Sequence, residues 1–296
     1  MAMTQAEAAK LSNDLLLRGV IETVVKESAL LNYLPFMNVT GTAVRYNREL
    51  TMPAASFYSV GDTWTEATPT FSEHTATLKI LGGDADVDNF LQSTYADTND
   101  IEAEVIASRA KAVAHKFMET FYEGSDTSDP ETFDGLQNLA SSGQSIFMGA
   151  NGGALTLDAV DELIDLVKPG RPEVLLMAKR TRRALKKLRR GSGIVVETSI
   201  DQFGQQVETY DGIPILVDDF CPIDESRGSG TDTSSIWAIR FGVGTGLMGL
   251  QHGGITVERV GELETKDATR HRFKWYCGLA LFSEMGLARL GGIAPS

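Results

Sequence analysis

The chain has 296 residues, of which 42% are hydrophobic, so it holds enough apolar material for one large core or two smaller ones. Its 40 Asp and Glu residues outnumber its 27 Lys and Arg residues, and the net charge of −13 excludes a general nucleic-acid binder, which needs a surplus of cations on at least one face. Only two cysteines occur, Cys221 and Cys277, so we expect buried, reduced thiols and neither a disulfide framework nor a metal cluster.

The N-terminal region shows no sign of export or membrane insertion. It lacks the basic-then-apolar pattern of a signal peptide, and nowhere in the chain does an apolar run reach the ~18 residues that a membrane helix requires. We therefore expect a protein made in the cytoplasm, without a membrane partner. Residues 4–31 have an amphipathic pattern broken at Gly19, which predicts a helical segment too short to be a domain.

Two alternating segments then flank a long segment without periodicity. Residues 41–50 predict one strand and residues 73–88 a second, which we expect to break at Gly82 and Gly83. The segment between them, residues 51–72, is interpreted as polar, and loops of this length are usually functional. A hairpin this long cannot bury itself, so we expect it to lie on a neighbouring subunit.

A long helix is the feature around which the rest of the chain is organised. Its pattern runs from about Asp100 to Glu123 and ends at Gly124, which gives a length of roughly 36 Å at ~1.5 Å per residue. We expect sheets to pack along this helix. Its apolar positions recur at helical spacing and are Ile101, Val105, Ala110, Val113, Phe117 and Phe121.

The second half of the chain predicts helices and strands in alternation, followed by strands alone. Residues 141–153 are glycine-rich and linker-like, and residues 227–230 predict an exposed loop. Thr156 is expected to cap a helix that runs to Val167, and the Asp211-Gly212 pair is typical of a hairpin turn. The expected strands cover residues 173–178, 193–198, 206–210, 213–217, 236–241 and 255–260, and a long apolar run covers 273–289.

Residues 244–249 match the G-x-G-x-x-G fingerprint of dinucleotide-binding proteins and follow an expected strand. That motif requires a helix that opens at its last glycine, and here residues 251–254 (Gln-His-Gly-Gly) stop any helix within a turn. A glycine-rich strand connection is therefore the preferred interpretation. A nucleotide-binding enzyme is the least favoured of the three functions considered below.

No other segment carries a catalytic or metal-binding pattern. The four histidines, His74, His115, His252 and His271, show no ligand spacing to one another or to the cysteines, and each is expected on a surface or a helix face. The acidic residues within 126–134 lack the register of a calcium loop and predict a solvated loop. We therefore expect no enzyme activity, no catalytic residue, no cofactor and no metal.

A basic helix at residues 179–190 departs from the charge of the rest of the chain. It holds eight cations and no acid, and without them the chain would have 19 basic against 40 acidic residues. One interpretation is that it faces DNA or an acidic surface of another copy, and the other is a solvated helix with Ala184 and Leu188 packed inward. Both stay open. The cations are Lys179, Arg180, Arg182, Arg183, Lys186, Lys187, Arg189 and Arg190.

The order of these elements resembles that of one protein family. An arm at residues 18–31, the long hairpin and the long helix are followed by Phe133-Asp-Gly-Leu136, and then by Tyr210-Asp-Gly-Ile-Pro-Ile215 with Asp218-Asp219. This order resembles the major capsid protein of tailed bacteriophages, which has the Hong Kong 97-type shell fold. The resemblance covers almost the whole chain, from about Leu15 to Ile293.

The resemblance implies an α+β fold with an N-terminal arm, an extended hairpin called the E-loop, a long spine helix, and peripheral (P) and axial (A) domains. The implied limits are residues 1–40 for the arm, 41–88 for the E-loop, 89–155 with 235–296 for the peripheral domain, 100–123 for its spine helix, and 156–234 for the axial domain.

The resemblance also implies a function. Pentamers and hexamers of the chain would close into an icosahedral shell around double-stranded DNA, assembled in the host cytoplasm and located in the virion. Implied partners are many other copies of the chain, the packaged DNA and a portal. If Met1 is the native start, it leaves no room before the arm for a built-in scaffolding segment, so we also expect a separate scaffolding protein.

Some members of this shell family link neighbouring subunits by an isopeptide bond from a loop lysine to an asparagine. Residues 41–73 contain no lysine, so we expect no such cross-link from the loop tip. Stability would then depend on burial, on exchange of arms and loops, or on a cementing protein. An encapsulin-like cellular compartment, which has the same fold and holds a cargo enzyme in place of a genome, is the second interpretation.

Overall fold

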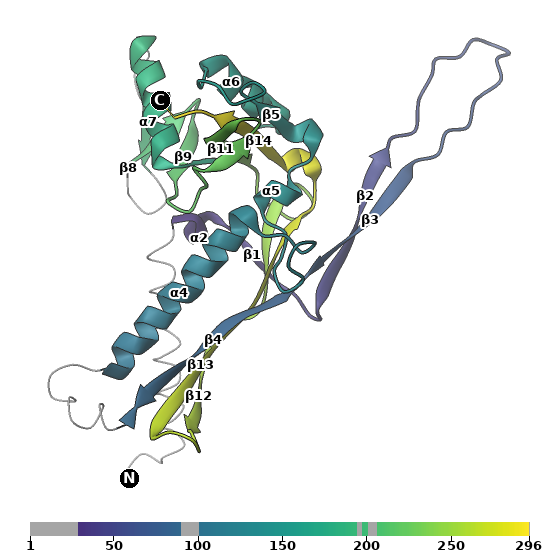
Figure 1. Ribbon diagram of the computed structural model, residues 1–296. Helices are drawn as coiled ribbons and strands as arrows, with labels where there is room; N and C mark the ends of the chain where they lie inside the picture. Colours follow the sequence, from purple (N-terminus) through teal and green to yellow (C-terminus); the bar gives the residue numbers. More distant parts are fainter. Residues whose placement is uncertain (1–28, 90–100, 194–196, 201–205, 296) are drawn as a thin grey trace.

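The computed structural model describes residues 29–89, 101–193, 197–200 and 206–295. Two β-sheets lie against a long helix, and a two-stranded hairpin projects away from them (Figure 1). This mixed α and β architecture agrees with the expected fold class. Most of the expected arm helix, residues 1–28, lies outside the described residues, and its described end is helix α2, Ala29–Tyr33.

Helix α4, Ile101–Glu123, confirms the expected long helix. Four residues of its apolar stripe are buried: Val113 is 5% exposed, and Ala110, Phe117 and Phe121 have no exposed surface. The ring centroids of Phe117 and Trp275 lie 4.6 Å apart, so the stripe packs directly on a strand of the sheet beside it. Burial of each large side chain stabilises the folded state by about 1.5–3 kcal/mol. Because several such side chains are buried along α4, the helix is held firmly against the sheet.

The sheet beside α4 has the strand order β1-β12-β13-β4. Its short edge strand β1 runs parallel to β12, and the other pairs are antiparallel. The expected apolar run at residues 273–289 is divided between two sheets, because a turn of 3₁₀ helix at Glu284–Gly286 separates its strands. The strands of this sheet are β1 (Phe36–Asn38), β4 (Lys79–Asp88), β12 (Leu247–Glu262) and β13 (Ala268–Leu281).

The break expected at Gly82 and Gly83 is wrong, because β4 runs through both residues and pairs with β13 at Lys274 and Phe273. A Cβ atom at Gly82 would lie 2.3 Å from the carbonyl oxygen of Phe273, far inside contact distance. Glycine therefore permits the close approach of β13 here and does not end the strand.

The second sheet has the strand order β5-β14-β11-β6-β9-β8-β7, and β10 pairs with β11 at its side. It combines strands from both sides of the expected domain limits at 155/156 and 234/235, so the division into peripheral and axial domains stays a prediction. The strands are β5 (Ser145–Phe147), β6 (Val174–Met177), β7 (Glu197–Ile200), β8 (Gln206–Tyr210), β9 (Ile213–Val217), β10 (Glu225–Arg227), β11 (Gly230–Ile239) and β14 (Leu287–Ile293).

Strand β6 separates two cores, because its side chains alternate between the two faces of the sheet. Val174 and Leu176 belong to the core that contains α4 and the short helix α5 (Leu136–Leu139). Leu175 and Met177 belong to the core beneath helices α6 (Leu157–Leu166) and α7 (Lys179–Gly191). Burial on both faces explains the continuous apolar sequence of this strand, which confirms the strand expected at 173–178.

Local sequence signals predicted most of the boundaries in this half. The hydroxyl oxygen of Thr156 accepts a hydrogen bond from the backbone N–H of Ala159 at 3.3 Å, which confirms the cap of α6. Asp211 and Gly212 have φ of 49° and 73°, as the expected hairpin turn requires. Residues 194–196 of the strand expected at 193–198 lie outside the described residues, and its last two residues lie in β7, Glu197–Ile200.

The segment at residues 227–230 contains a tight turn between β10 and β11, and its two turn residues, Gly228 and Ser229, are exposed as expected. The guanidinium carbon of Arg227 lies 3.7 Å from the centroid of the Phe147 ring. Gly228 has φ of 58°, and a Cβ atom there would lie 2.1 Å from the side-chain oxygen of Asn151. The turn is therefore packed against neighbouring chain, which a glycine-rich sequence alone does not reveal.

Candidate functional site

The hairpin expected to be the E-loop is the part of the chain that projects away from both sheets (Figure 1). Strands β2 (Ala43–Thr51) and β3 (Thr70–Thr77) pair antiparallel and extend away from both sheets (Figure 1). The strands were expected, but the interpretation of the tip as polar is wrong, because residues 52–69 hold exposed apolar side chains. These are Met52, Phe57, Val60 and Trp64, each at least 78% exposed.

The tip of the hairpin has a conformation of its own. The rings of Tyr58 and Trp64 stack with centroids 4.5 Å apart, and the Tyr58 hydroxyl lies 2.9 Å from that of Thr65. A side-chain oxygen of Asp62 accepts a hydrogen bond from the backbone N–H of Ser59 at 2.6 Å and closes the turn between them. Within the described residues, every hydrogen bond and ion pair of this tip stays inside the hairpin.

The root of the hairpin is tied to the body by polar contacts. The hydroxyl of Tyr46 donates to the carbonyl oxygen of Leu281 at 2.8 Å, and Nε of Arg48 donates to that of Phe282 at 3.1 Å. The Arg48 guanidinium also pairs with Glu284 at 2.9 Å. These contacts join positions more than 230 residues apart in sequence, so local patterns could not have predicted them.

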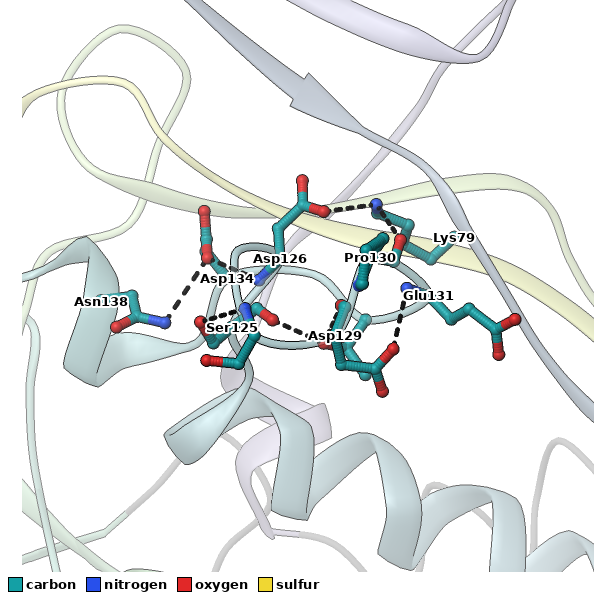
Figure 2. Close-up of polar contacts among 10 residues, drawn as sticks. Lys79, Ser125, Asp126, Asp129, Pro130, Glu131, Asp134 and Asn138 are labelled. Atoms are coloured by element: carbon teal, nitrogen blue, oxygen red, sulfur yellow. Dashed lines mark hydrogen bonds and ion pairs between the residues drawn. The ribbon is translucent and has the colours of Figure 1, made fainter.

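A second set of polar contacts joins the start of β4 to the loop that follows α4 (Figure 2). Nζ of Lys79, at the start of β4, lies 3.0 Å from a carboxylate oxygen of Asp126 and 2.7 Å from the carbonyl oxygen of Pro130. A cavity of about 300 Å³ lies between this loop and the hairpin root, lined by Arg48, His74 and Glu284 among others. Burial and the nearby Arg48 cation lower the pKa of His74, and Glu284 partly opposes them.

Two other acidic side chains of this loop accept hydrogen bonds from the loop's own backbone (Figure 2). A side-chain oxygen of Asp134 accepts a hydrogen bond from the backbone N–H of Asp126 at 3.0 Å, and one of Asp129 accepts from that of Glu131 at 3.1 Å. Nδ2 of Asn138 donates to the carbonyl oxygen of Gly124 at 2.7 Å, which ties the loop to the end of α4. No group of three or more metal-ligating side chains occurs anywhere in the described part of the chain.

Helix α7 confirms the expected basic helix, and its cations differ in their surroundings. Lys179 pairs with Asp219 at 2.6 Å, and Arg180 donates to the carbonyl oxygen of Asp232 at 2.7 Å. Arg189, 4% exposed, donates to the carbonyl oxygen of Thr209 at 2.7 Å. Further internal contacts are the ion pair of Lys186 with Glu208 and the hydrogen bond of Arg190 to the carbonyl oxygen of Lys186.

The remaining cations of α7 are Arg182, Arg183 and Lys187. Arg182 is partly buried, and its Nε has no hydrogen-bond partner among the described atoms. Arg183 and Lys187 lie on the exposed face, one helical turn apart. Neither the DNA-facing nor the subunit-facing role of the helix is tested by these contacts, so both stay predictions.

The glycine fingerprint at residues 244–249 does not precede a helix. It forms the turn between β11 and β12, and its last residues lie within β12. A Cβ atom at Gly246 would lie 2.0 Å from the carbonyl oxygen of Arg240, and one at Gly249 would lie 2.6 Å from the ring of Phe36. These glycines allow close packing of backbone, and the nucleotide-binding interpretation loses the helix on which it depends.

We expect Gly246→Ala to destabilise the subunit by about 1–3 kcal/mol, because the added methyl group forces backbone atoms apart. Gly143→Ala is the matched control, since nothing lies within 4 Å of a Cβ atom at that position and its φ suits any residue. Urea unfolding of both variants measures the difference. Equal stability of the two variants would contradict the packing role of Gly246.

The histidines and cysteines do not form a reactive centre. His271 is 1% exposed within β13, so its expected surface position is wrong. Both cysteines are buried and free, as expected, and burial raises the pKa of Cys277 to about 12. A thiol with so high a pKa is a poor nucleophile at neutral pH.

Asp218 is the partly buried acid of the Asp218-Asp219 pair, and Asp219 is exposed. One of its oxygens accepts from the hydroxyl of Tyr122 at 3.0 Å and the other from the backbone N–H of Phe220 at 2.9 Å. Burial nevertheless raises its pKa, against the effect of these two hydrogen bonds. The folded state therefore favours the protonated acid, and this contribution to stability is complete below the unfolded pKa and is lost as pH rises through the folded pKa.

We expect Asp218→Asn to increase the free energy of unfolding relative to wild type at pH 7, and to change it much less near pH 4. The amide keeps the size of the acid and carries no charge to be buried. Asp219→Asn is the control, because Asp219 is exposed. Thermal or urea unfolding of the three proteins between pH 4 and 8 measures this, and a pH-independent effect of Asp218→Asn would contradict the expectation.

Comparison with known proteins identifies the family. The family model described as "Phage capsid family" matches residues 11–290. The chain belongs to the phage capsid family. It is therefore a shell-forming capsid protein, a structural component of the virion, and the expected resemblance to tailed-phage capsid proteins is confirmed.

Solved structures show the fold of this phage capsid family member at low sequence identity. The holo-SrpI encapsulin complex of Synechococcus elongatus matches with a TM-score of 0.72 at 19% identity, covering 99% of this chain and 96% of that one. The capsid of an empty GTA particle matches at 0.65 and 16%, covering 90% of each chain. The Mycobacterium phage Bobi structure matches at 0.64 and 15%, covering 91% of each.

Two negative findings complete the comparison. No curated protein matches the sequence. Among the described residues, no helix is long and apolar enough to cross a membrane.

Proposed function

We propose that this chain is the major subunit of a phage head, which assembles through pentamers and hexamers into an icosahedral shell around double-stranded DNA. The observation that carries the proposal is the E-loop tip. Its apolar side chains are exposed, and the tip forms no hydrogen bond or ion pair with the rest of the described chain, so another molecule can bury them. A neighbouring copy provides that surface at every position of a closed shell.

The remaining roles follow from the same proposal. The chain would divide into a peripheral and an axial domain near the expected limits, which cross the second sheet, with α4 as the spine. Assembly would take place in the host cytoplasm with a separate scaffolding protein and a portal. Stability would come from burial of the E-loop tips or from a cementing protein, because residues 41–73 offer no lysine for a cross-link.

An encapsulin-like compartment is the second candidate. The observation in its favour is the match to the SrpI encapsulin complex, whose TM-score of 0.72 exceeds the 0.64 and 0.65 of the two capsids compared above. The two candidates share the shell and differ in the contents. Packaged DNA supports the first, and an enclosed protein supports the second.

The experiment is assembly of the purified chain, followed by sedimentation velocity over a wide concentration range and electron microscopy of the fast fraction. Rings of five or six copies or closed shells are expected. Particles recovered from infected cells should then hold DNA that resists added nuclease. A small species that never grows, even with a candidate scaffolding protein, would overturn the shell function. Nuclease-resistant particles that hold protein and no DNA would favour the compartment.

A further inference from the structure

Helix α7 presents a basic face whose cations form no ion pair within the described part of the chain. Arg183, Lys187 and Arg190 are exposed on this face, and none of them forms an ion pair with a described residue. The helix contains no acidic residue that could pair with them along its own length. We call Arg183, Lys187 and Arg190 the basic face.

Helix α6 presents the opposite charge. Its exposed residues include Asp158, Asp161, Glu162 and Asp165, and the helix contains no cation. Asp161 accepts a hydrogen bond from the hydroxyl of Tyr210 at 2.6 Å, and within the described chain none of the four carboxylates forms an ion pair. We call these four residues the acidic face.

The two faces belong to the same layer of the fold. Both helices pack on one side of the eight-stranded sheet, through Val160 and Leu163 of α6 and through Ala184 and Leu185 of α7. In Figure 1, both helices lie in the upper part of the molecule, with α7 to the left of α6. The charged residues of both faces are exposed, and no ion pair between described residues joins the two helices.

We propose that the basic face of α7 binds the acidic face of α6 in a neighbouring copy of the chain. This proposal rests on the proposed shell function, because rings of copies are built from head-to-tail contacts that bring two different surfaces of one chain together. The chain offers two such surfaces, of opposite charge and on the same layer. Complementary charges of this kind fix the register of a contact and reject wrong partners.

A second copy fits the basic face better than DNA does. A duplex that approached α7 would also meet the four carboxylates of α6 on the same layer, in a chain whose net charge is −13. The carboxylates of α6 would repel the phosphates of the duplex. Phosphate binding also needs a continuous basic surface. The acidic face of another copy has the required charge and is repeated in every subunit.

Charge reversal tests the contact. The variant Arg183→Glu/Lys187→Glu reverses part of the basic face, and Glu162→Lys/Asp165→Lys reverses part of the acidic face while leaving Asp161 with Tyr210 and Asp158 in the first turn of α6. All four positions are exposed, so circular dichroism and the melting temperature of the unassembled subunit should not change. Each variant alone is expected to lose at least tenfold in the yield of rings and shells by sedimentation velocity and electron microscopy.

The variant that carries all four substitutions tests whether charge complementarity between the two faces is what assembly requires. It restores the net charge of the wild type and exchanges the two signs, so shell yield should return to near the wild-type level. Normal assembly of the basic-face variant with loss of nuclease-resistant DNA would overturn the proposal and assign the helix to DNA. Failure of the combined variant to assemble would also overturn it. Failure of the wild-type chain to form shells would instead refute the proposed function.

Discussion

Replacing Phe57 and Trp64 at the E-loop tip by serine is expected to abolish shell assembly and leave the subunit folded. Both side chains are exposed in the free subunit, so their removal costs the fold little. In an interface, buried aromatic anchors commonly contribute about 2 kcal/mol or more each, and this loss would recur at every subunit contact. Sedimentation velocity and electron microscopy measure assembly, and circular dichroism measures folding.

Thr63→Ala/Glu66→Ala is the matched control for this variant, because both residues are exposed at the same tip and are polar. We expect it to assemble in normal yield. Since Trp64 stacks on Tyr58, the single change Phe57→Ser also shows whether loss of assembly requires disruption of the tip turn. Normal shells from the Phe57→Ser/Trp64→Ser variant would show that the tip does not hold neighbouring copies together.

Elements with a strong local signal could be predicted from the sequence. The last turns and the end of α4 followed from the spacing of Phe117 and Phe121 and from Gly124, and the start of α6 followed from Thr156. Each of these signals comes from residues that are close together in the sequence, because helical periodicity and helix capping depend on the local backbone. The basic helix α7 was predicted for the same reason, because its charges are adjacent in sequence.

Features that depend on distant partners could not be predicted. Gly82 has the sequence signature of a strand break, and only the carbonyl oxygen of Phe273 across the sheet shows why glycine is needed. Arg48 and Glu284 are 236 positions apart, so no local pattern connects them. The apolar tip residues Phe57 and Trp64 lack periodicity, because an exposed loop has no buried face of the subunit to follow.

A buried ion pair between β14 and β10 leads to the largest expected effect on stability. The Arg289 guanidinium lies 2.9 Å from a carboxylate oxygen of Glu225, and these side chains are 16% and 8% exposed. Ser235 donates to the same oxygen at 2.5 Å, and Nε of Arg289 donates to the Ser235 hydroxyl at 3.1 Å. The carboxylate of Glu225 therefore depends on Arg289 for its neutralisation.

We expect Arg289→Met to lower the free energy of unfolding by about 3–5 kcal/mol, because it leaves the Glu225 charge buried without its counter-ion. Lys116→Met is the matched control: it removes a cation from an ion pair with Glu119 in which both side chains are more than half exposed, and it should cost at most about 1 kcal/mol. The double variant Arg289→Met/Glu225→Leu removes both charges and should recover most of the loss, since an apolar pair can replace a buried ion pair at little cost. Urea unfolding of the unassembled subunit measures all three, and similar losses for Arg289→Met and Lys116→Met would show that the buried pair does not stabilise this sheet.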